Sequence, residues 1–355
     1  MIERGHLSIK VLFVPVGGER VASSRLRVYQ YLDALKQLGI EPHVLRFGGR
    51  RPLLRGVSPA LAVLRLLWGM AGADVVVIQK LMLSRRVWRL MALLRRPTIY
   101  DFDDAIFTSP HWLRARSGLD RQRKDQLEWA VSHSDAVIVS GEFLAAYARQ
   151  HNSRVHVIPT PIDTDRFAPG PQQPAGRLTI GWVGLKDNLY YLEQIGGVLR
   201  RLAARFPGSW VLKVISNGTF ELPGVPVFNQ RWSLEREVED LRGIDIGIMP
   251  LDTSDDAWTS GKTGTKAMQY MAMGIPAVVS AVEFTQRLIE DGSSGFLAAT
   301  EDEWFAKLSA LLEDESLRRR VGLAGRAVVE RDYSLKANAP RLTGVIERIA
   351  GGHGR

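Results

Sequence analysis

The chain has 355 residues, 45% of them hydrophobic and 24% charged, a composition typical of folded globular proteins and not of disordered or fibrous ones. Its length suits two domains of about 150 to 180 residues each. Because it contains no cysteine, disulfides, thiolate catalysis and cysteine-based zinc or iron–sulfur sites are excluded. The net charge of +9 comes from the first half, where residues 1–165 hold 24 Lys and Arg against 15 Asp and Glu. Such a basic half favours a nucleic acid, an anionic lipid or a phosphorylated substrate, and a solvated surface without a partner is an equal alternative.

The first half alternates apolar runs with amphipathic segments. Strands are predicted at 9–16, 41–47, 73–80, 97–102 and 135–140, and helices at 23–39, 60–70, 85–96, 126–134 and 142–151. Strands that recur between helices predict a mostly parallel, doubly wound α/β sheet. The first residues lack the apolar core of a signal peptide, and no run reaches 18 apolar residues, so we expect a cytoplasmic protein without a membrane span.

The pattern restarts after a stretch rich in proline and glycine at 158–177. Strands are then predicted at 177–184, 210–216, 244–251, 275–282 and 294–300, and helices at 188–206, 233–243, 284–292 and from about 302 to 350. We therefore predict two Rossmann-like domains in tandem, at 1–160 and 178–335, with an interdomain connection at 161–177.

Two segments of the first half are basic and apolar together. Residues 50–70 and 84–96 both combine arginines with leucines and a tryptophan, a composition that suits a membrane surface. The favoured alternative is an ordinary helix that packs on the sheet and keeps its basic flanks in water.

In a doubly wound sheet, ligands bind beyond the carboxyl ends of the strands. After the first strand, Gly17 and Gly18 allow close backbone approach, and Arg25 and Arg27 begin the next helix, so this loop suits an anionic acceptor or is an ordinary turn. After the strand at 97–102, the run "YDFDD" places Asp101 and Asp103 on one side and Asp104 in the loop. Carboxylates in this position can bind a metal, accept hydroxyl hydrogen bonds or act as a base, or instead cap a helix and pair with an arginine.

The loop that follows the strand at 244–251 contains "SGKTGTKAMQYMA". If a helix starts near Thr263, its free N–H groups favour an anion. Lys262, Lys266 and Gln269 would then share one helix face, while the alternative is a pair of solvent-exposed lysines beside a buried helix. A weaker candidate is the end of the second domain's first strand, where Gly184 precedes Lys186 and Asn188.

Four stretches together carry a family resemblance that spans nearly the whole chain. They are "SSRLRVYQYLDALKQLGIE", "VIPTPIDTDRF", "TKAMQYMAMGIPAVVSAV" and the closing run from "IEDGSSGFLAAT" to "VVERDYS". The chain resembles the GT-B glycosyltransferases, particularly the family 4 retaining enzymes that use nucleotide-diphosphate sugars.

The resemblance implies two Rossmann-like domains facing a cleft, with a final helix at 336–355 that packs on the first domain. It implies a nucleotide-sugar donor held by the second domain, an acceptor held by the first, and neither a metal nor another cofactor, since basic residues and a helix N-terminus take the diphosphate charge. The implied catalytic residues are Asp103, Asp104 and Lys262, and the implied acceptor-binding residues are Gly17, Gly18, Arg25 and Arg27. The implied donor-binding residues are Gly184, Lys186, Asn188, Asp255, Asp256, Thr263, Gly264, Thr265, Lys266 and Gln269.

The chain departs from the family pattern at functional positions. Gly261 and Gln269 stand where the family carries the two acids of its E-x₇-E pattern, so Asp255 or Asp256 is expected to replace the first acid. Asp103 stands where many members carry a histidine, and Leu185 and Lys186 follow Gly184 where members carry an arginine and lysine pair.

The leading hypothesis is retaining transfer of a sugar to a carbohydrate or lipid-linked acceptor in cell-surface polysaccharide or glycolipid synthesis, at the inner face of the membrane. The alternatives are a sugar-nucleotide epimerase on the same scaffold and a basic protein without catalysis that binds a membrane surface or nucleic acid. Nucleic acid is the least favoured partner, because the basic residues are not interleaved with clustered aromatics.

Overall fold

A computed structural model describes residues 8–46, 59–108, 117–170, 176–253 and 256–352. The chain divides into two compact units. Unit 1 comprises Met1–Pro161, Gly261–Thr263 and Leu335–Arg355, and unit 2 comprises Ile162–Ser260 and Gly264–Ser334. The last helix of the chain therefore groups with the first unit.

Unit 1 is built on a six-stranded parallel sheet with the order β2-β1-β3-β4-β5-β6. Its strands are β1 (Ile9–Pro15), β2 (Ile40–Val44), β3 (Val75–Gln79), β4 (Thr98–Phe102), β5 (Ala136–Val139) and β6 (Val155–Val157). Its helices are α1 (Ala22–Arg27), η1 (Tyr29–Tyr31), α2 (Leu32–Gln37), α3 (Pro59–Ala71), α4 (Arg85–Ala92), α5 (Ser117–Ser132), α6 (Glu142–Arg149) and α15 (Leu335–Gly352). The short strand β6 was not predicted from the sequence.

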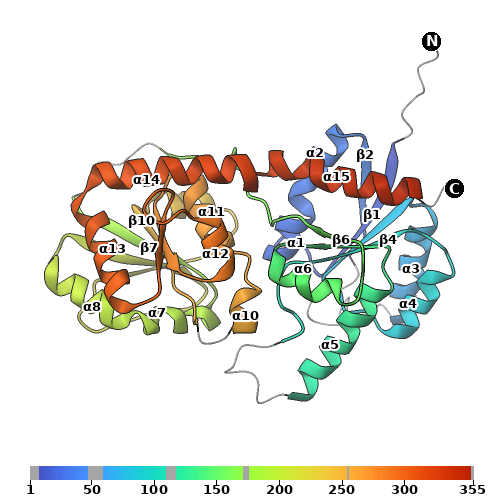
Figure 1. Cartoon of the computed structure of the whole chain (residues 1–355), viewed down its shortest axis with the longest axis horizontal. Coiled ribbons are helices and arrows are strands. Elements are labelled where there is room, and N and C mark those ends of the chain that lie inside the picture. Colours follow the sequence, from blue (N-terminus) through green and yellow to red (C-terminus); the bar gives the residue numbers. More distant parts are fainter. Residues whose placement is uncertain (1–7, 47–58, 109–116, 171–175, 254–255, 353–355) are drawn as a thin grey trace, which may run out of the picture. The chain divides into compact units, whose positions relative to one another are not determined.

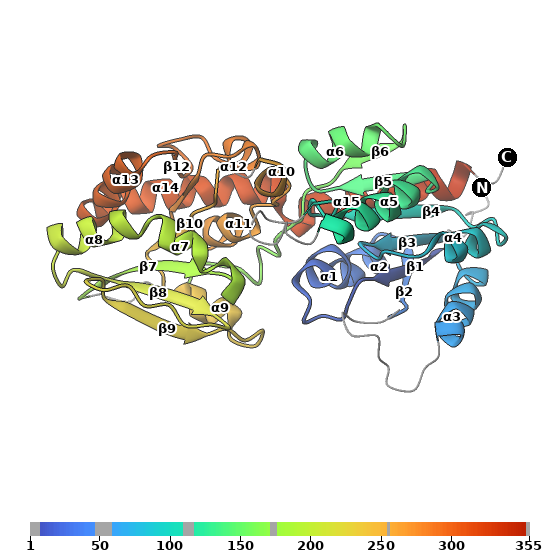
Figure 2. The ribbon, with the colours of Figure 1, turned by 90° about the horizontal axis from the view of Figure 1, so that it is seen from below.

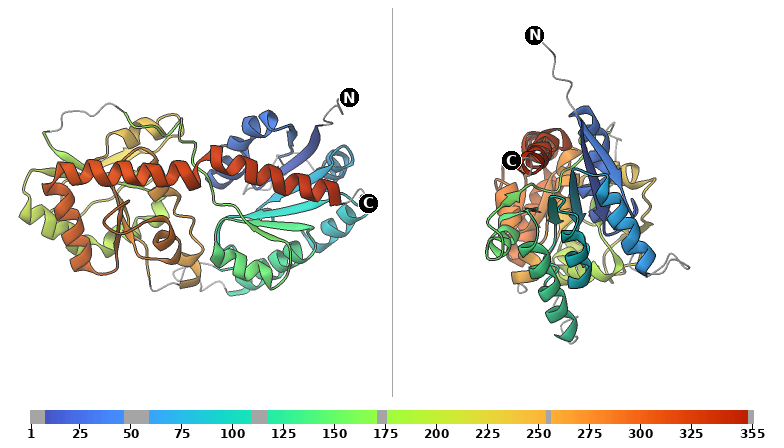
Figure 3. Two further views of the ribbon diagram at one scale, coloured as in Figure 1. Left: turned by 45° about the horizontal axis from the view of Figure 1, so that its top comes forward. Right: turned by 90° about the vertical axis from the view of Figure 1, so that its right-hand side faces the viewer.

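Alternation along the strands of unit 1 supplies two apolar layers. In β3, Val75 and Val77 join a core with α2 and α15, whereas Val76 and Ile78 join a core with α3, α4 and α5. Helices thus cover both faces of the sheet (Figures 1 and 2), and α15 lies along one of them (Figure 3, left). Both faces are buried, which explains the nearly continuous apolar runs of these strands.

The prediction of one helix over 23–39 was wrong. The segment forms α1, the 3₁₀ turn η1 and α2, with a break at Val28, whose φ is −127° and ψ −65°. Residues 24–28 are all buried, whereas a surface helix buries one stripe of its circumference. A regular amphipathic helix could not bury five consecutive residues, and the break at Val28 lies at the end of this buried stretch.

Unit 2 contains a second six-stranded parallel sheet, with the order β12-β11-β10-β7-β8-β9. Its strands are β7 (Leu178–Val183), β8 (Trp210–Ser216), β9 (Val227–Arg231), β10 (Ile246–Met249), β11 (Ala277–Ser280) and β12 (Phe296–Ala298). Its helices are η3 (Lys186–Asn188), α7 (Tyr190–Gln194), α8 (Gly196–Arg205), α9 (Glu237–Arg242), α10 (Asp256–Ser260), α11 (Thr265–Ala272), α12 (Glu283–Leu288), α13 (Glu301–Glu313), α14 (Glu315–Val328) and the π-helical turn η4 (Val329–Tyr333). The α/β prediction with two doubly wound sheets is confirmed.

The described part of the proline-rich connection contributes to the core of unit 2. Ile162 and Phe167 are buried there, and Arg326 of α14 donates a hydrogen bond of 3.3 Å to the carbonyl of Phe167. These residues therefore pack as part of a folded unit and do not form a free linker. Within the described ranges, no helix is long and apolar enough to cross a membrane.

Candidate active site

In unit 1, polar residues gather at the C-terminal ends of β1, β3 and β4. The first strand, β1, lies between β2 and β3. The chain therefore adds β2 on one side of β1 and the later strands on the other side, so the strand order reverses at β1. Such a switch point is where doubly wound sheets bind ligands. Gln79 ends β3 and is fully buried, and Asp101 and Asp103 follow in and after the neighbouring β4, with only 5% of each residue exposed.

We call Ser23, Lys80, Asp103, Asp104 and Lys262 the acid–lysine cluster. Asp103 Oδ1 accepts hydrogen bonds from Ser23 Oγ at 2.7 Å and from Lys80 Nζ at 3.1 Å, and Lys80 also pairs with Asp104. Lys80 has a φ of +57°, which is uncommon for a lysine. Its two ion pairs hold this side chain beside the aspartates, and strained backbone of this kind concentrates at functional sites.

The charges of the cluster control its protonation. Burial alone would raise the pKa of Asp103, but the charges of Lys80 and Arg27 and the hydrogen bond from Ser23 outweigh burial and lower it. Burial likewise would lower the pKa of Lys80, and the two aspartates reverse that effect and raise it. At neutral pH, Asp103 is therefore a carboxylate and Lys80 an ammonium.

Lys262 joins this cluster from a distant part of the sequence, because Gly261–Thr263 groups with unit 1. Burial lowers the pKa of Lys262, the nearby Lys80 lowers it further, and Asp104 opposes both. The adjacent Gly261 packs on the loop after β4: a Cβ there would lie 2.4 Å from the Cβ of Ala105 and 2.8 Å from its backbone nitrogen. Position 261, where the resembled family carries an acid, has no room for a side chain.

The predicted acceptor-binding residues of the first loop have internal contacts. Arg27 has 4% of its surface exposed, pairs with Asp101 through two nitrogens and donates a 2.7 Å hydrogen bond to the carbonyl of Ile158. These partners favour a structural role for Arg27, and its role in acceptor binding stays a prediction. Arg25 is also largely buried and donates to the carbonyl of Glu19 at 3.1 Å.

The acceptor-binding role of Gly17 and Gly18 in the same loop stays a prediction. The N–H of Gly17 donates to Ser24 Oγ at 3.0 Å, and a Cβ at Gly17 would lie 2.5 Å from a methyl group of Val21. Around Gly18 the nearest atoms that a Cβ would meet lie 3.9 Å away, on Arg46. Only Gly17 thus has a steric requirement for glycine.

In unit 2, the switch point lies at β7, which stands between β8 and β10. Gly184 follows β7, and a Cβ there would lie 2.3 Å from the ring of Trp182. Lys186 is exposed, and its backbone N–H donates to Asn217 Oδ1 at 2.7 Å. The half-buried Asn188 ends the same turn.

The start of α11 differs from the prediction. The helix begins at Thr265, and the preceding Gly264 has a φ of +61° and a Cβ position only 2.4 Å from the ring of Phe284, so glycine is required there. Lys262 therefore lies outside the helix. The predicted face shared by Lys262 and Lys266 does not form, and the half-buried Thr263 groups with unit 1 instead.

Lys266 and Gln269 do share a face of α11 and lead to a buried carboxylate. Lys266 Nζ donates to Gln269 Oε1 at 3.2 Å, and Gln269 Nε2 donates to Glu237 Oε1 at 3.4 Å. Gln269 and Glu237 are each at most 2% exposed, and Arg166 pairs with Glu237 at 3.3 Å. The glutamine that replaces a family acid thus has a glutamate of another helix beside it.

The acids expected in the loop after β10 are only partly described. Asp255 lies outside the described residues, and Asp256 is the first residue of α10. Asp252, which was not predicted, is 6% exposed and accepts a hydrogen bond of 2.9 Å from Tyr190 Oη. Its carbonyl accepts from Thr259 Oγ1 at 2.7 Å.

Sequence reasoning missed several residues of both sites. Gln79 was not considered, although its amide donates to Ser23 Oγ at 2.7 Å and accepts from Ser24 Oγ at 3.1 Å. Gln79 and Lys80 close a predicted strand, which is the same signal that singled out the aspartates, so they could have been found. Glu237 carried no such signal, because it lies inside an ordinary charged helix.

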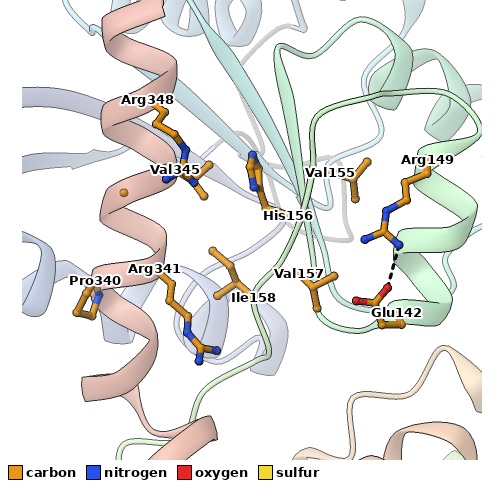
Figure 4. A pocket seen from close by; sticks show the side chains of 11 residues that line it. Glu142, Arg149, Val155, His156, Val157, Ile158, Pro340, Arg341, Val345 and Arg348 are labelled. Carbon is orange, nitrogen blue, oxygen red and sulfur yellow. Dashed lines mark hydrogen bonds and ion pairs between the residues drawn. The ribbon is translucent and has the colours of Figure 1, made fainter.

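A hollow of about 470 Å³ opens on another part of unit 1, lined by residues of α6, β6 and α15. Its polar lining includes Arg149, His156, Arg341 and Arg348, and Arg149 pairs at 2.9 Å with Glu142 of the same helix, α6, on one side of the hollow (Figure 4). Not one of the predicted site residues lines this hollow. In the part of the chain that the structure describes, no group of three His, Asp or Glu residues is arranged to hold a metal ion.

Two family models match the chain. Glycosyltransferase Family 4 matches residues 22–166, and Glycosyl transferases group 1 matches residues 221–314. The first match includes the aspartates of the acid–lysine cluster, and the second includes α11. Together the models cover well over half of the chain. The protein is a glycosyltransferase with the GT-B fold; its first half matches the family 4 model and its second half the group 1 model.

Solved structures agree with this fold. Sucrose-phosphate synthase from Thermosynechococcus elongatus has a TM-score of 0.71 and 15% identity, with 97% of this chain and 100% of that chain covered. A glycosyltransferase from Rickettsia africae has a TM-score of 0.69 and 12% identity, covering 96% and 98%. HepE from Anabaena, solved in complex with UDP-glucose, has a TM-score of 0.65 and 15% identity, covering 96% and 99%. No curated protein sequence matches this chain.

Proposed function

We propose that this glycosyltransferase moves a sugar from a nucleotide-diphosphate sugar to a hydroxyl group of a carbohydrate or lipid-linked acceptor, with retention of the anomeric configuration. The observation that carries the proposal is the buried, ionised Asp103, fixed by Ser23 and Lys80 in a cluster with Lys262. A carboxylate held in this way can stabilise positive charge that develops on the transferred sugar, or orient an acceptor hydroxyl.

The donor is proposed to be a UDP-sugar or a close relative. HepE, which shares the fold of this chain, was solved with UDP-glucose and with UDP and glucose. The proposed contacts on unit 2 are the close-approach glycines Gly184 and Gly264, the exposed Lys186, and Lys266 in the first turn of α11. Backbone N–H groups at a helix start and two ammonium groups suit a diphosphate.

The reaction is proposed to need no metal. The bond between the anomeric carbon and the diphosphate oxygen breaks, and the acceptor oxygen attacks on the same face while its proton passes to the departing phosphate. Lys262 and Lys266 neutralise the negative charge that collects on that phosphate, a role that fixed cationic groups fulfil in place of a metal ion. Burial lowers the pKa of Lys262, and the negative charge of a bound diphosphate would raise it again and favour the ammonium form.

The remaining parts of the proposal concern the location of the enzyme in the cell and its biosynthetic role. We place the enzyme in the cytoplasm, on the inner face of the membrane, in the synthesis of cell-surface polysaccharide or glycolipid. A lipid-linked acceptor would require this location, and the exposed apolar and basic residues of α3 and α4 support it.

The test combines binding and turnover. Calorimetry with UDP, GDP and dTDP, followed by a panel of nucleotide sugars, should identify one nucleotide that binds and one sugar that is slowly hydrolysed. Lys262→Ala should lower kcat by about 10²-fold or more. The matched control is Lys36→Ala, a lysine on the surface of α2 that is paired with Asp33. Binding of none of the three nucleotides would contradict the proposal, and a sugar that changes configuration while it stays on the nucleotide would indicate an epimerase.

A further inference from the structure

Half of the exposed large apolar side chains in the described residues lie on α3 and α4 or directly after them. On α3, Trp68 is 84% exposed and Leu64 61%, with Leu61 on the same stripe. Leu90 of α4 and Leu93 beyond it, the latter 76% exposed, continue the patch. We call these five side chains the α3–α4 face; the two helices pack side by side (Figures 1 and 2).

This face is not the stripe that each helix uses for packing. The helix α3 buries Leu66 and Met70 against the sheet, and α4 buries Trp88 and Met91. A helix that only covers a sheet has a polar opposite side. On α3 the opposite side also carries Trp68 and two leucines, so this helix is apolar on two sides, and Leu90 and Leu93 add to its outer side; that outer side suits another partner.

The charges around the face identify that partner. Residues 85–96 contain five arginines and no acid, and Arg65 lies between Leu64 and Trp68 on α3. Arg85 and Arg89 stack on Trp129 of α5, at 4.7 Å and 5.8 Å from its ring centroid, and Arg96 donates to the carbonyl of Ala71 at 2.8 Å. Arg65, Arg86 and Arg95 are exposed beside the apolar residues.

We propose that the α3–α4 face docks on an anionic membrane surface, with Trp68, Leu64 and Leu93 inserted at the headgroup level and the arginines on lipid phosphates. Tryptophan favours the membrane interface, and arginine extends its guanidinium to phosphate while its stem stays apolar. The positive charge of these arginines complements the phosphates of anionic lipids, and clusters of arginine beside an apolar stripe bind such surfaces. Charge complementarity therefore favours an anionic membrane as the partner. This inference rests on the membrane location given in the proposed function and deepens it, because it names the docking residues and the class of lipid; its test needs neither donor nor acceptor.

The experiment measures sedimentation of the full chain with vesicles of phosphatidylcholine, alone or mixed with phosphatidylglycerol, without nucleotide. The wild-type protein should bind the mixed vesicles and release as salt rises. The triple variant Leu64→Ser, Trp68→Ser, Leu93→Ser should weaken binding by about tenfold for each side chain removed. Arg65→Gln and Arg86→Gln should each weaken it about fivefold. Because these side chains are exposed, melting temperatures should stay unchanged.

Matched controls are Leu323→Ser, a leucine of α14 that is 64% exposed, and the exposed pair Arg319→Gln and Arg320→Gln. They should bind like the wild type. Brominated phosphatidylcholine in the mixed vesicles should quench the wild-type fluorescence, and Trp68→Phe should lose most of that quenching while it still sediments. Equal binding to both vesicle types, equal loss in the controls or no binding at all would overturn the proposal. Self-association that depends on Trp68, or binding to DNA or RNA in place of vesicles, would overturn it too.

Discussion

The two units place their first strand at the same position, where the strand order reverses, yet they equip that edge differently. In unit 1 the edge is filled by buried charges, with Lys80 between two aspartates and Arg27 paired with Asp101. In unit 2 the corresponding edge has glycines whose side-chain space is taken by Trp182 and Phe284, with the exposed Lys186 nearby. The comparison shows two ways to prepare for a charged ligand: unit 1 fixes charge in advance, and unit 2 lets the backbone approach closely.

The strongest way to break the comparison is to remove the central charge of unit 1. Lys80→Met leaves Asp103 and Asp104 without their shared cation, and Asp103 is buried. We expect the free energy of unfolding to fall by about 3 to 5 kcal/mol, as for other broken buried pairs. Urea denaturation measures this loss. The double variant Lys80→Met, Asp103→Asn should recover part of the lost free energy of unfolding. Equal stability of Lys80→Met and the wild type would show that Lys80 does not stabilise the two aspartates.

A second test concerns the missing acid at position 261. Gly261→Ala should cost about 1 to 3 kcal/mol, because its Cβ would collide with Ala105. Gly261→Glu should not raise activity, since the side chain has no space. Thermal melts and turnover measure both effects. The double variant Gly261→Ala, Ala105→Gly should regain stability in part, and an active, stable Gly261→Glu enzyme would contradict the packing described here.

In unit 2 the equivalent test removes the buried hydrogen bond of Gln269. Gln269→Leu leaves Glu237 with one neutral partner fewer, at a cost of about 1 to 3 kcal/mol. Gln269→Glu places two carboxylates together, so its stability should be lower at pH 8 than at pH 5, as measured by chemical denaturation at both values. A Gln269→Glu protein that is equally stable at both pH values would show that Glu237 and position 269 do not interact.

The smallest expected effect is a change in folding stability at acid pH. Because the pKa of Asp103 is lowered in the folded protein, its stabilisation is complete above the pKa of a free aspartate, about 4, and is lost as the pH falls through the lower folded value. Asp103→Asn should therefore lose less stability below about pH 4 than the wild type does. Asp245 of unit 2 should have the opposite effect. Burial raises its pKa, so its protonation stabilises the folded protein as the pH falls, and Asp245→Asn should make the loss of stability in acid steeper. A steeper acid loss in Asp103→Asn would contradict the assigned shift.

Much of the fold followed from the pattern of residues. Apolar strands such as 73–80 and 275–282, separated by amphipathic helices, predicted both doubly wound sheets, because a sheet buried on both faces needs continuous apolar runs. The edge strands β6 and β9 were missed, since strands that are half exposed lose this signal. The break at Val28 was missed as well, because a helical period does not report where the backbone must turn inward.

The acids and lysines of the candidate site were likewise visible as residue types at strand ends, but their partners were not. The sequence by itself determined the class of fold, the position of Asp103 and Asp104 at a strand end and that of Lys262 shortly before a helix, because strand ends and helix starts are local features. Only the tertiary structure decided that Lys80 neutralises the aspartates, that Arg27 faces inward, that Gly264 separates Lys262 from α11 and that Trp68 faces outward. The physical reason is that charge pairing and burial depend on distances between segments that lie far apart in the chain.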